Sequence, residues 1–199
     1  MYCTIKTLTI KRIIIKRALI ILSFAVCVSS LQAAGDGSTL HELKQKGTDF
    51  LLRGDYAAAL VIEHRLLEEF DEPVGQTFAL NTMVTHLAWD ETSTDFDVAL
   101  PENARQTLNW CKPRLKKDPK DELANFYCGQ AHFALAYFEA LHGNYYQAGR
   151  HGTLCIELLE AALETNHGLV DAKMHLGAAY FFADHLPPFV RMFSKFLWF

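Results

Sequence analysis

The sequence lacks the patterns that mark most catalytic and metal-binding proteins. Its nine histidines form no HExxH or HxxxH motif, and its five cysteines form no CxxC motif or Cys-His cluster with zinc spacing. No nucleophile-base pair or paired-carboxylate arrangement emerges, so we expect no enzyme, no metal site and no cofactor. A spatial cluster of histidines stays open as a minor alternative, and its members would be His132, His142, His151, His175 and His185.

Strand patterns and low-complexity blocks are also missing. Half of the 199 residues are hydrophobic, which is enough for the core of one ordinary domain. No convincing alternation of apolar and polar residues predicts a sheet. We therefore expect an all-α protein.

The first 34 residues differ from the rest. Five basic residues precede the apolar run ALIILSFAVCV at 18–28, and small residues follow at Ala33 and Ala34. This order is typical of a secretory signal peptide, predicted here as 1–34. The run is shorter than the roughly 20 residues of a spanning helix, so we expect cleavage and export to the periplasm. Cys27 lacks the small residue that should precede it in a lipoprotein signal.

Removal of this leader would change the net charge. The whole chain has 19 basic and 23 acidic residues, a net charge of −4, and the leader holds five of the basic residues and none of the acidic ones. Residues 35–199 would therefore carry a charge of about −9. Such an acidic body is poorly suited to a phosphate backbone, so we expect no nucleic-acid partner.

From residue 40 onward the sequence predicts helix after helix, with Gly and Pro between them. The helices pair into antiparallel hairpins that make one helical domain over 35–199. The expected hairpins are about 40–73, 76–118, 121–165 and 170–199. Further repeats would be expected after the last hairpin, so one interpretation is that the array is truncated at Phe199. Pro113 lies inside a predicted helix and should kink it, because proline has no N–H to donate.

Two stretches that begin 89 residues apart share one pattern. GDYAAA at 54–59 and GNYYQA at 143–148 both fit Gly-x-Tyr-x-x-Ala, and each lies between two predicted helices. Around the second copy the spacing doubles, because Gly47 to Gly54 is seven residues and Gly129 to Gly143 is fourteen. Seven residues are close to two helical turns. Each helix of the third hairpin should therefore be longer by two turns.

These residues resemble tetratricopeptide (TPR) repeats, helix-turn-helix units of 34 residues with small residues at tight helix contacts. The matching positions are Gly47, Gly54, Tyr56, Ala59, Gly129, Gly143, Tyr145, Ala148, Ala162 and Gly177. The resemblance implies a TPR-like α-α superhelix, a right-handed solenoid of hairpins. It covers 40–73 and 119–185 well and 74–118 poorly. Segment 123–199 is also similar to exported bacterial repeat proteins of the periplasm or outer membrane, through GNY at 143–145 and ADHLPPF at 183–189.

The resemblance implies a function only by class. We expect a non-catalytic scaffold that binds another protein or a peptide segment, in the periplasm or at the inner face of the outer membrane. Tyr127, Tyr137, Tyr145 and Tyr146 are candidates for a binding groove, because a phenol can present its hydroxyl group to a ligand. The candidate partner-binding residues are Tyr127, Tyr137 and Tyr180. The alternative is a periplasmic module that binds a small molecule or a saccharide, which would need a deep pocket where these tyrosines converge with histidines.

Core residues are predicted from the same helices. Phe126, Phe133 and Phe181 have the spacing of core residues. Cys128 and Cys155 lie on the two helices of the third hairpin, about four residues or roughly 6 Å out of register, so we expect small buried thiols there. Spacing alone dictates no pairing for Cys111.

The last residues, FVRMFSKFLWF at 189–199, have an amphipathic helical pattern. Apolar residues share one side, and the other side holds Arg191, Ser194, Lys195 and Trp198. We interpret this segment as the returning helix of the fourth hairpin, packed on 170–185. The alternatives are a basic segment in peripheral contact with a membrane and a face that awaits further repeats.

Overall fold

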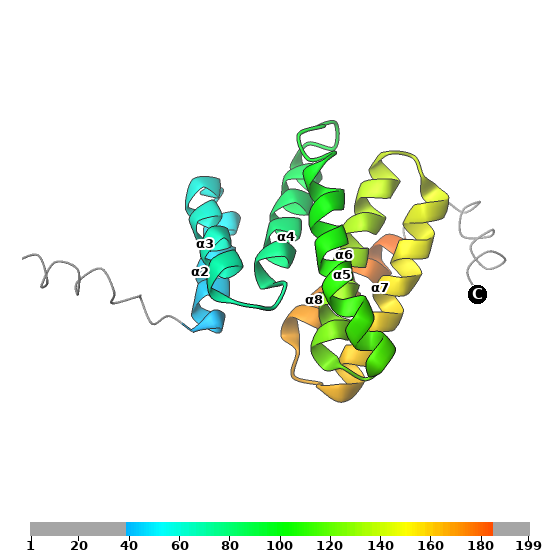
Figure 1. Cartoon of the computed structure of the whole chain (residues 1–199). Helices are drawn as coiled ribbons and strands as arrows, with labels where there is room; N and C mark the ends of the chain where they lie inside the picture. The colour runs from blue at the N-terminus through cyan, green and yellow to red at the C-terminus, as the bar shows by residue number, and fades with distance from the viewer. Residues whose placement is uncertain (1–38, 185–199) are drawn as a thin grey trace, which may run out of the picture. The chain divides into compact units, whose positions relative to one another are not determined.

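The computed structural model describes residues 39–184 (Figure 1). The predicted signal peptide at 1–34 and the predicted returning helix at 189–199 lie outside these residues. Contacts divide the chain into two units, Met1–His41 and Glu42–Phe199, and nearly all described residues belong to the second.

Seven α-helices and no strand make up the described residues, which confirms the all-α prediction. The helices, labelled as in Figure 1, are α2 Leu40–Leu52, α3 Tyr56–Glu69, α4 Val74–Trp89, α5 Ala99–Lys117, α6 Glu122–Leu141, α7 Tyr145–Thr165 and α8 Val170–Asp184. The helix α5 continues through Pro113. Within this span, none of the helices has the length and apolar character that a bilayer crossing requires.

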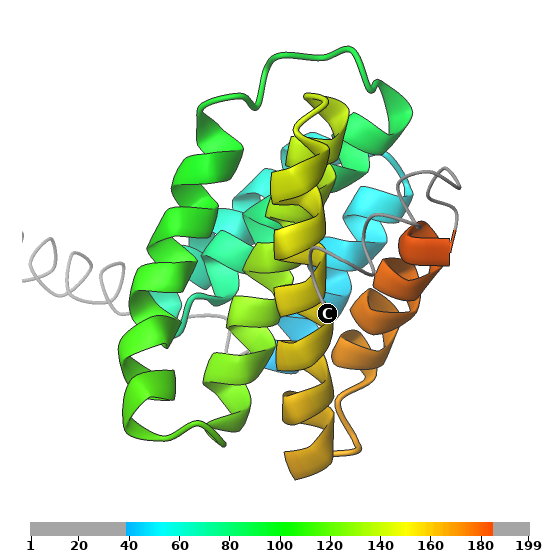
Figure 2. The same ribbon diagram turned by 90° about the vertical axis from the view of Figure 1, so that its right-hand side faces the viewer.

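The helices are arranged in two layers. Helix α4 packs against α6, and α6 packs against α8, so alternate helices of the chain contact one another. Helix α2 joins them through Gly47, where a Cβ atom would lie 2.6 Å from the Phe78 ring of α4. We call α2, α4, α6 and α8 the inner layer. The intervening helices pack on it, and in Figure 2 α5 and α8 lie on opposite sides of the α6–α7 hairpin.

The two Gly-x-Tyr-x-x-Ala stretches form the same turn. Gly54 and Gly143 both have a φ of +74°, the left-handed conformation that favours glycine. In each turn the glycine N–H donates to the carbonyl three residues back, and the next N–H donates to the carbonyl five residues back. These bonds are Gly54 to Leu51 (3.0 Å), Asp55 to Phe50 (2.9 Å), Gly143 to Ala140 (3.1 Å) and Asn144 to Glu139 (2.8 Å). Both are Schellman helix ends, so the repeated sequence encodes a repeated structure.

The helices of the third hairpin have the extra length that the spacing predicts. Helix α6 has 20 residues where α2 has 13, and α7 has 21 where α3 has 14. Close packing accompanies this length, because a Cβ atom on Gly129 would lie 2.7 Å from the Leu159 side chain. Ala162 and, in the first hairpin, Ala59 are also buried.

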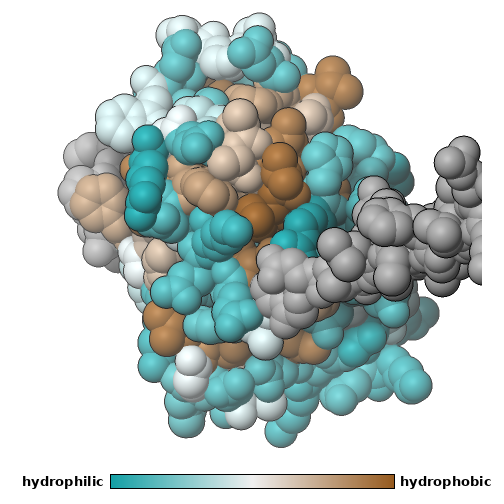
Figure 3. All heavy atoms as spheres, turned by 90° about the vertical axis from the view of Figure 1, so that its left-hand side faces the viewer, coloured by the Kyte–Doolittle hydropathy of each residue, from teal (hydrophilic) through white to brown (hydrophobic). Residues whose placement is uncertain are grey.

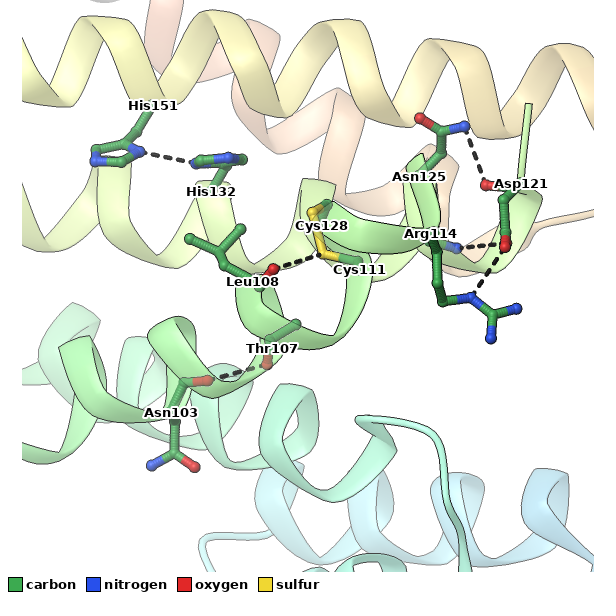
Figure 4. The surroundings of a disulfide bond; sticks show 11 residues. Asn103, Thr107, Leu108, Cys111, Arg114, Asp121, Asn125, Cys128, His132 and His151 are labelled. Atoms are coloured by element: carbon green, nitrogen blue, oxygen red, sulfur yellow. Dashed lines mark hydrogen bonds and ion pairs between the residues drawn. A yellow bond between two sulfur atoms is a disulfide. The ribbon is translucent and has the colours of Figure 1, made fainter. Parts of the chain in front are cut away.

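One cysteine prediction is wrong. Cys111 and Cys128 form a buried disulfide with a Cα–Cα distance of 5.9 Å (Figure 4). They lie at equal distances from the turn at 118–121, so the antiparallel helices α5 and α6 bring them together. Cys155 is a buried free thiol, as predicted, and burial raises its pKa to about 12.

The three phenylalanines predicted for the core differ. Phe126 is buried and Phe133 is half-buried, whereas the Phe181 residue is 57% exposed. The prediction for Phe181 is therefore wrong within the described residues. Phe181 belongs to α8, the last described helix, so no described helix follows that could cover it.

Apolar side chains are also exposed on the first hairpin. Leu60, Val61 and Leu67 of α3 are exposed, and so is Leu52 at the end of α2. Figure 3 shows the side of the molecule that carries α2 and α3, where hydrophobic surface gathers between hydrophilic regions.

Candidate functional site

A cluster of polar side chains connects the helices of the inner layer. We call it the inner polar cluster, and its members are Lys44, Glu72, Asn81, Tyr127, Asp171 and His175. They come from α2, the α3–α4 connection, α4, α6 and α8. Three side-chain contacts cross between these elements, so the inner layer is joined by polar bonds as well as by apolar packing.

The first contact joins α2 to α8. Lys44 Nζ lies 2.5 Å from Asp171 Oδ2 and 5.8 Å from the centre of the Phe126 ring. Both charged side chains are partly exposed, so the pair contributes at most about 1 kcal/mol to stability. Both charges therefore remain partly accessible to solvent.

The second contact buries one of the predicted partner-binding residues. The Tyr127 hydroxyl donates to Glu72 Oε2 at 3.0 Å, and the ring packs edge-on against Trp110 with centroids 5.8 Å apart. Burial and the Glu72 carboxylate raise the Tyr127 pKa, so the phenol stays protonated and donates. Tyr127 is only 4% exposed. It lies beneath the surface and connects α6 to the start of α4.

The third contact joins α8 to α4 through a buried histidine. His175 Nδ1 lies 2.8 Å from the Asp171 carbonyl and therefore donates to it, while Nε2 lies 3.0 Å from Asn81 Oδ1. Burial lowers the pKa of His175, so the ring is neutral near pH 7. In that state Nε2 accepts, so the Asn81 amide has to turn over and offer its NH2 group to Nε2 in place of Oδ1. Protonation would reverse this bond, because both ring nitrogens would then donate.

Aromatic rings form a partly exposed surface beside this cluster. The Tyr137 ring of α6 lies 5.7 Å from the Phe182 ring of α8, and Phe133 lies 6.4 Å from Phe182. Phe133 also meets His175 edge-on at 5.5 Å, which places the three rings next to the inner polar cluster. Phe182 is 46% exposed and Tyr137 is half-buried. We call Phe133, Tyr137 and Phe182 the aromatic seam.

Tyr180, the third predicted partner-binding residue, has a different environment. Its hydroxyl donates to Glu160 Oε1 of α7, and this bond raises the Tyr180 pKa. Tyr127, Tyr137 and Tyr180 therefore contact three different sets of neighbours. Tyr137 belongs to the aromatic seam, whereas Tyr180 is 44% exposed on α8 and bonds to α7.

Two of the histidines that the sequence analysis named for a possible spatial cluster, His132 and His151, form a pair on the third hairpin. His132 Nδ1 lies 2.8 Å from His151 Nδ1, and the rings stack with centroids 5.0 Å apart (Figure 4). One ring must donate and the other accept, so the bond requires at least one neutral ring. Burial lowers the pKa of His132 to about 3, with smaller effects from His151 and Lys112. Within residues 39–184, no group of three His, Cys, Asp or Glu residues could hold a metal ion.

A shallow depression lies at the tip of the third hairpin. It has a volume of about 380 Å³ and is lined by the turn residues Gly143, Asn144, Tyr145, Tyr146 and Gln147. The inner layer also holds two buried side-chain oxygens, Gln76 Oε1 and Gln130 Oε1, that bond to no described residue. These amides would be available to water or to a ligand that enters the layer.

Comparison with known proteins adds no family to this description. No family model matches the chain, and neither do the curated proteins or the solved structures.

Proposed function

We propose that this chain is a non-catalytic TPR-like scaffold that binds a segment of another protein on its inner layer. The repeated turn supports the repeat architecture, because Gly54 and Gly143 share both their φ and their hydrogen-bond pattern. Repeats of this kind present the first helix of each hairpin on one surface. In this chain those helices are α2, α4, α6 and α8.

The aromatic seam is the observation that carries the proposal. Partly exposed aromatic residues are enriched among the residues that contribute most to protein interfaces. Tyr137 and Phe182 supply such anchors, and Lys44 and Asp171 supply charges of both signs on the same layer. An extended peptide or a helix with an apolar side chain and mixed charges would suit this surface.

The disulfide supports an exported location. Disulfides persist in oxidising compartments such as the bacterial periplasm and are rare in the cytosol. The buried Cys111–Cys128 bridge therefore agrees with the predicted signal peptide. We propose that the protein acts in the periplasm or at the inner face of the outer membrane.

Binding of a small molecule or a saccharide has less support. That function needs tyrosines that converge on a deep pocket. Tyr127 is instead buried against Trp110 and Glu72, and Tyr180 pairs with Glu160 at the side of α7.

Photocrosslinking in cells tests the proposal. A photoreactive phenylalanine analogue would replace Tyr137 in the full chain, and Tyr146, which is 53% exposed on α7, would be the matched control. We expect a discrete crosslinked partner from position 137 and none from position 146. Equal capture at both positions, or no capture at 137, would contradict a binding surface on the inner layer.

A further inference from the structure

The two ends of helix α5 carry opposite charges. The segment that precedes it, 90–98, has four acidic residues and no basic one, and we call it the acidic loop. Three exposed lysines lie at the other end, and we call Lys116, Lys117 and Lys120 the lysine end. Helix α5 has 19 residues, so about 28 Å separate the two groups of charges (Figure 2).

Neighbouring charges of the same chain do not neutralise either group. The chain has no Lys or Arg from 66 to 104, and within the described residues neither Glu91 nor Asp95 forms an ion pair. The described ion pair beside the lysine end joins Arg114 to Asp121 at 2.9 Å and includes none of the three lysines. The dipole of α5 favours such charges only within its first and last turns, so it does not account for Glu91, eight residues before the helix.

The acidic loop is held in one conformation. The Phe96 ring lies 5.5 Å from the His86 ring of α4, and Asp97 Oδ1 lies 3.2 Å from Nε2 of His142 at the end of α6. The Asp97 N–H also donates to the Thr94 carbonyl at 3.2 Å. A loop that is already ordered loses little conformational freedom when it binds. Its exposed carboxylates are therefore presented as a fixed set.

Exposed apolar side chains accompany the charges at both ends. Trp89 and Val98, which flank the acidic loop, are each 83% exposed. Val170, at the start of α8, is 72% exposed. The Asn166 side chain donates to Glu122 Oε1 at 2.9 Å, which holds the α7–α8 connection beside the α5–α6 turn and so near the lysine end (Figure 2). Each end therefore offers apolar surface as well as charge.

We propose that two copies of this chain associate end to end, with the acidic loop of one copy against the lysine end of the other. Opposite charges align the two ends, and a lysine ammonium group can lie over the exposed Trp89 ring. A second copy is the occupant because both complementary surfaces lie on the same chain. The contact is head-to-tail, so it can repeat along a row of copies.

The net negative charge of the chain does not prevent this contact. At physiological salt, exposed charges more than about 8 Å apart are largely screened, so the charges at the contact outweigh those elsewhere on the two copies. The surface involved is small, and we therefore expect a weak, salt-dependent association. None of its residues belongs to the aromatic seam, so the inference does not rest on the proposed function.

Sedimentation velocity of the full chain tests the contact. We expect the wild type to self-associate at low ionic strength, with a Kd at least about tenfold weaker in about 0.5 M NaCl. The loop variant Glu91→Lys/Asp95→Lys cancels the charge of the acidic loop, and the end variant Lys117→Glu/Lys120→Glu reverses two of the three lysines. All four side chains are exposed, so both variants should fold. Each variant alone should stay monomeric.

An equimolar mixture of the two variants makes the test specific. The end variant keeps its acidic loop and the loop variant keeps its lysine end, so the mixture should form 1:1 dimers and nothing larger. The matched control Glu68→Lys/Glu157→Lys makes the same charge change as the loop variant on exposed residues of α3 and α7, and it should associate at least as well as the wild type.

Three results would overturn the proposal. A wild-type protein that stays monomeric at every concentration and ionic strength would show that the two ends do not bind each other. Self-association that survives in both variants would place the contact elsewhere on the chain. A mixture that remains monomeric would show that the variants do not act through the acidic loop and the lysine end.

Discussion

Replacing Gly152 by alanine should stabilise the protein, whereas the same replacement at Gly129 should not. Both glycines lie inside long helices of the third hairpin, Gly129 in α6 and Gly152 in α7. Alanine favours a helix interior over glycine by about 1 kcal/mol. At Gly152 the new methyl group meets none of the described atoms within 4 Å, so Gly152→Ala should stabilise the protein by about that amount.

At Gly129 the same methyl group has no room. It would lie 2.7 Å from both Cγ and Cδ2 of Leu159, and Leu159 is fully buried and cannot turn into solvent. Overpacking of this kind costs about 1–3 kcal/mol, which cancels or exceeds the helix gain. The two variants should therefore differ by about 1–3 kcal/mol in their free energy of unfolding. Urea unfolding of both variants measures this difference, and a Gly129→Ala variant as stable as Gly152→Ala would refute the close contact between α6 and α7.

Three further predictions follow from buried groups. Replacing Cys111 and Cys128 by serine should lower the free energy of unfolding by about 3 kcal/mol, because the bridge closes a loop with a sequence separation of 17. An unchanged thermal midpoint of the wild-type protein on adding reductant would argue against the bridge. The free energy of unfolding should fall as the pH falls below about 6.5, because the pKa of His132 is lowered in the folded protein and the unfolded chain binds the proton first. By pH 5 this loss is up to about 2 kcal/mol. Urea titrations at pH 7 and pH 5 measure it, and His132→Gln should reduce it. Tyr127→Phe should lower the free energy of unfolding by about 1.5–3 kcal/mol, because it removes a donor to the Glu72 carboxylate. Tyr145→Phe changes an exposed side chain and should have no effect. Thermal melts of both variants measure this difference.

The helices and their turns were predictable from the sequence because their signals are local. The turns at Gly54 and Gly143 have a φ of +74°, which favours glycine at these two positions. The doubled spacing from Gly129 to Gly143 predicted the extra length of α6 and α7. The disulfide was within reach of the same reasoning. Reflecting the antiparallel helices about the turn at 118–121 pairs Cys111 with Cys128, as the structure does.

The candidate site was less predictable because its contacts are long-range. Lys44 and Asp171 are 127 residues apart, and Asn81 and His175 are 94 residues apart, so no local spacing brings them together. Tyrosines on α6 cannot be sorted into buried and exposed from an aromatic-rich helix alone. The structure separates them, since Tyr127 bonds to Glu72 and Tyr137 reaches Phe182.

Affinity measured on a captured partner tests the central claim most directly. The segment of the partner that crosslinks at position 137 would be titrated against the wild-type protein, Tyr137→Ala and the control Tyr145→Ala, whose side chain is exposed at the start of α7. Loss of an aromatic anchor should weaken binding by at least about tenfold in Kd, while the control should bind like the wild type. Equal Kd values for the wild type and Tyr137→Ala would contradict partner binding at the aromatic seam.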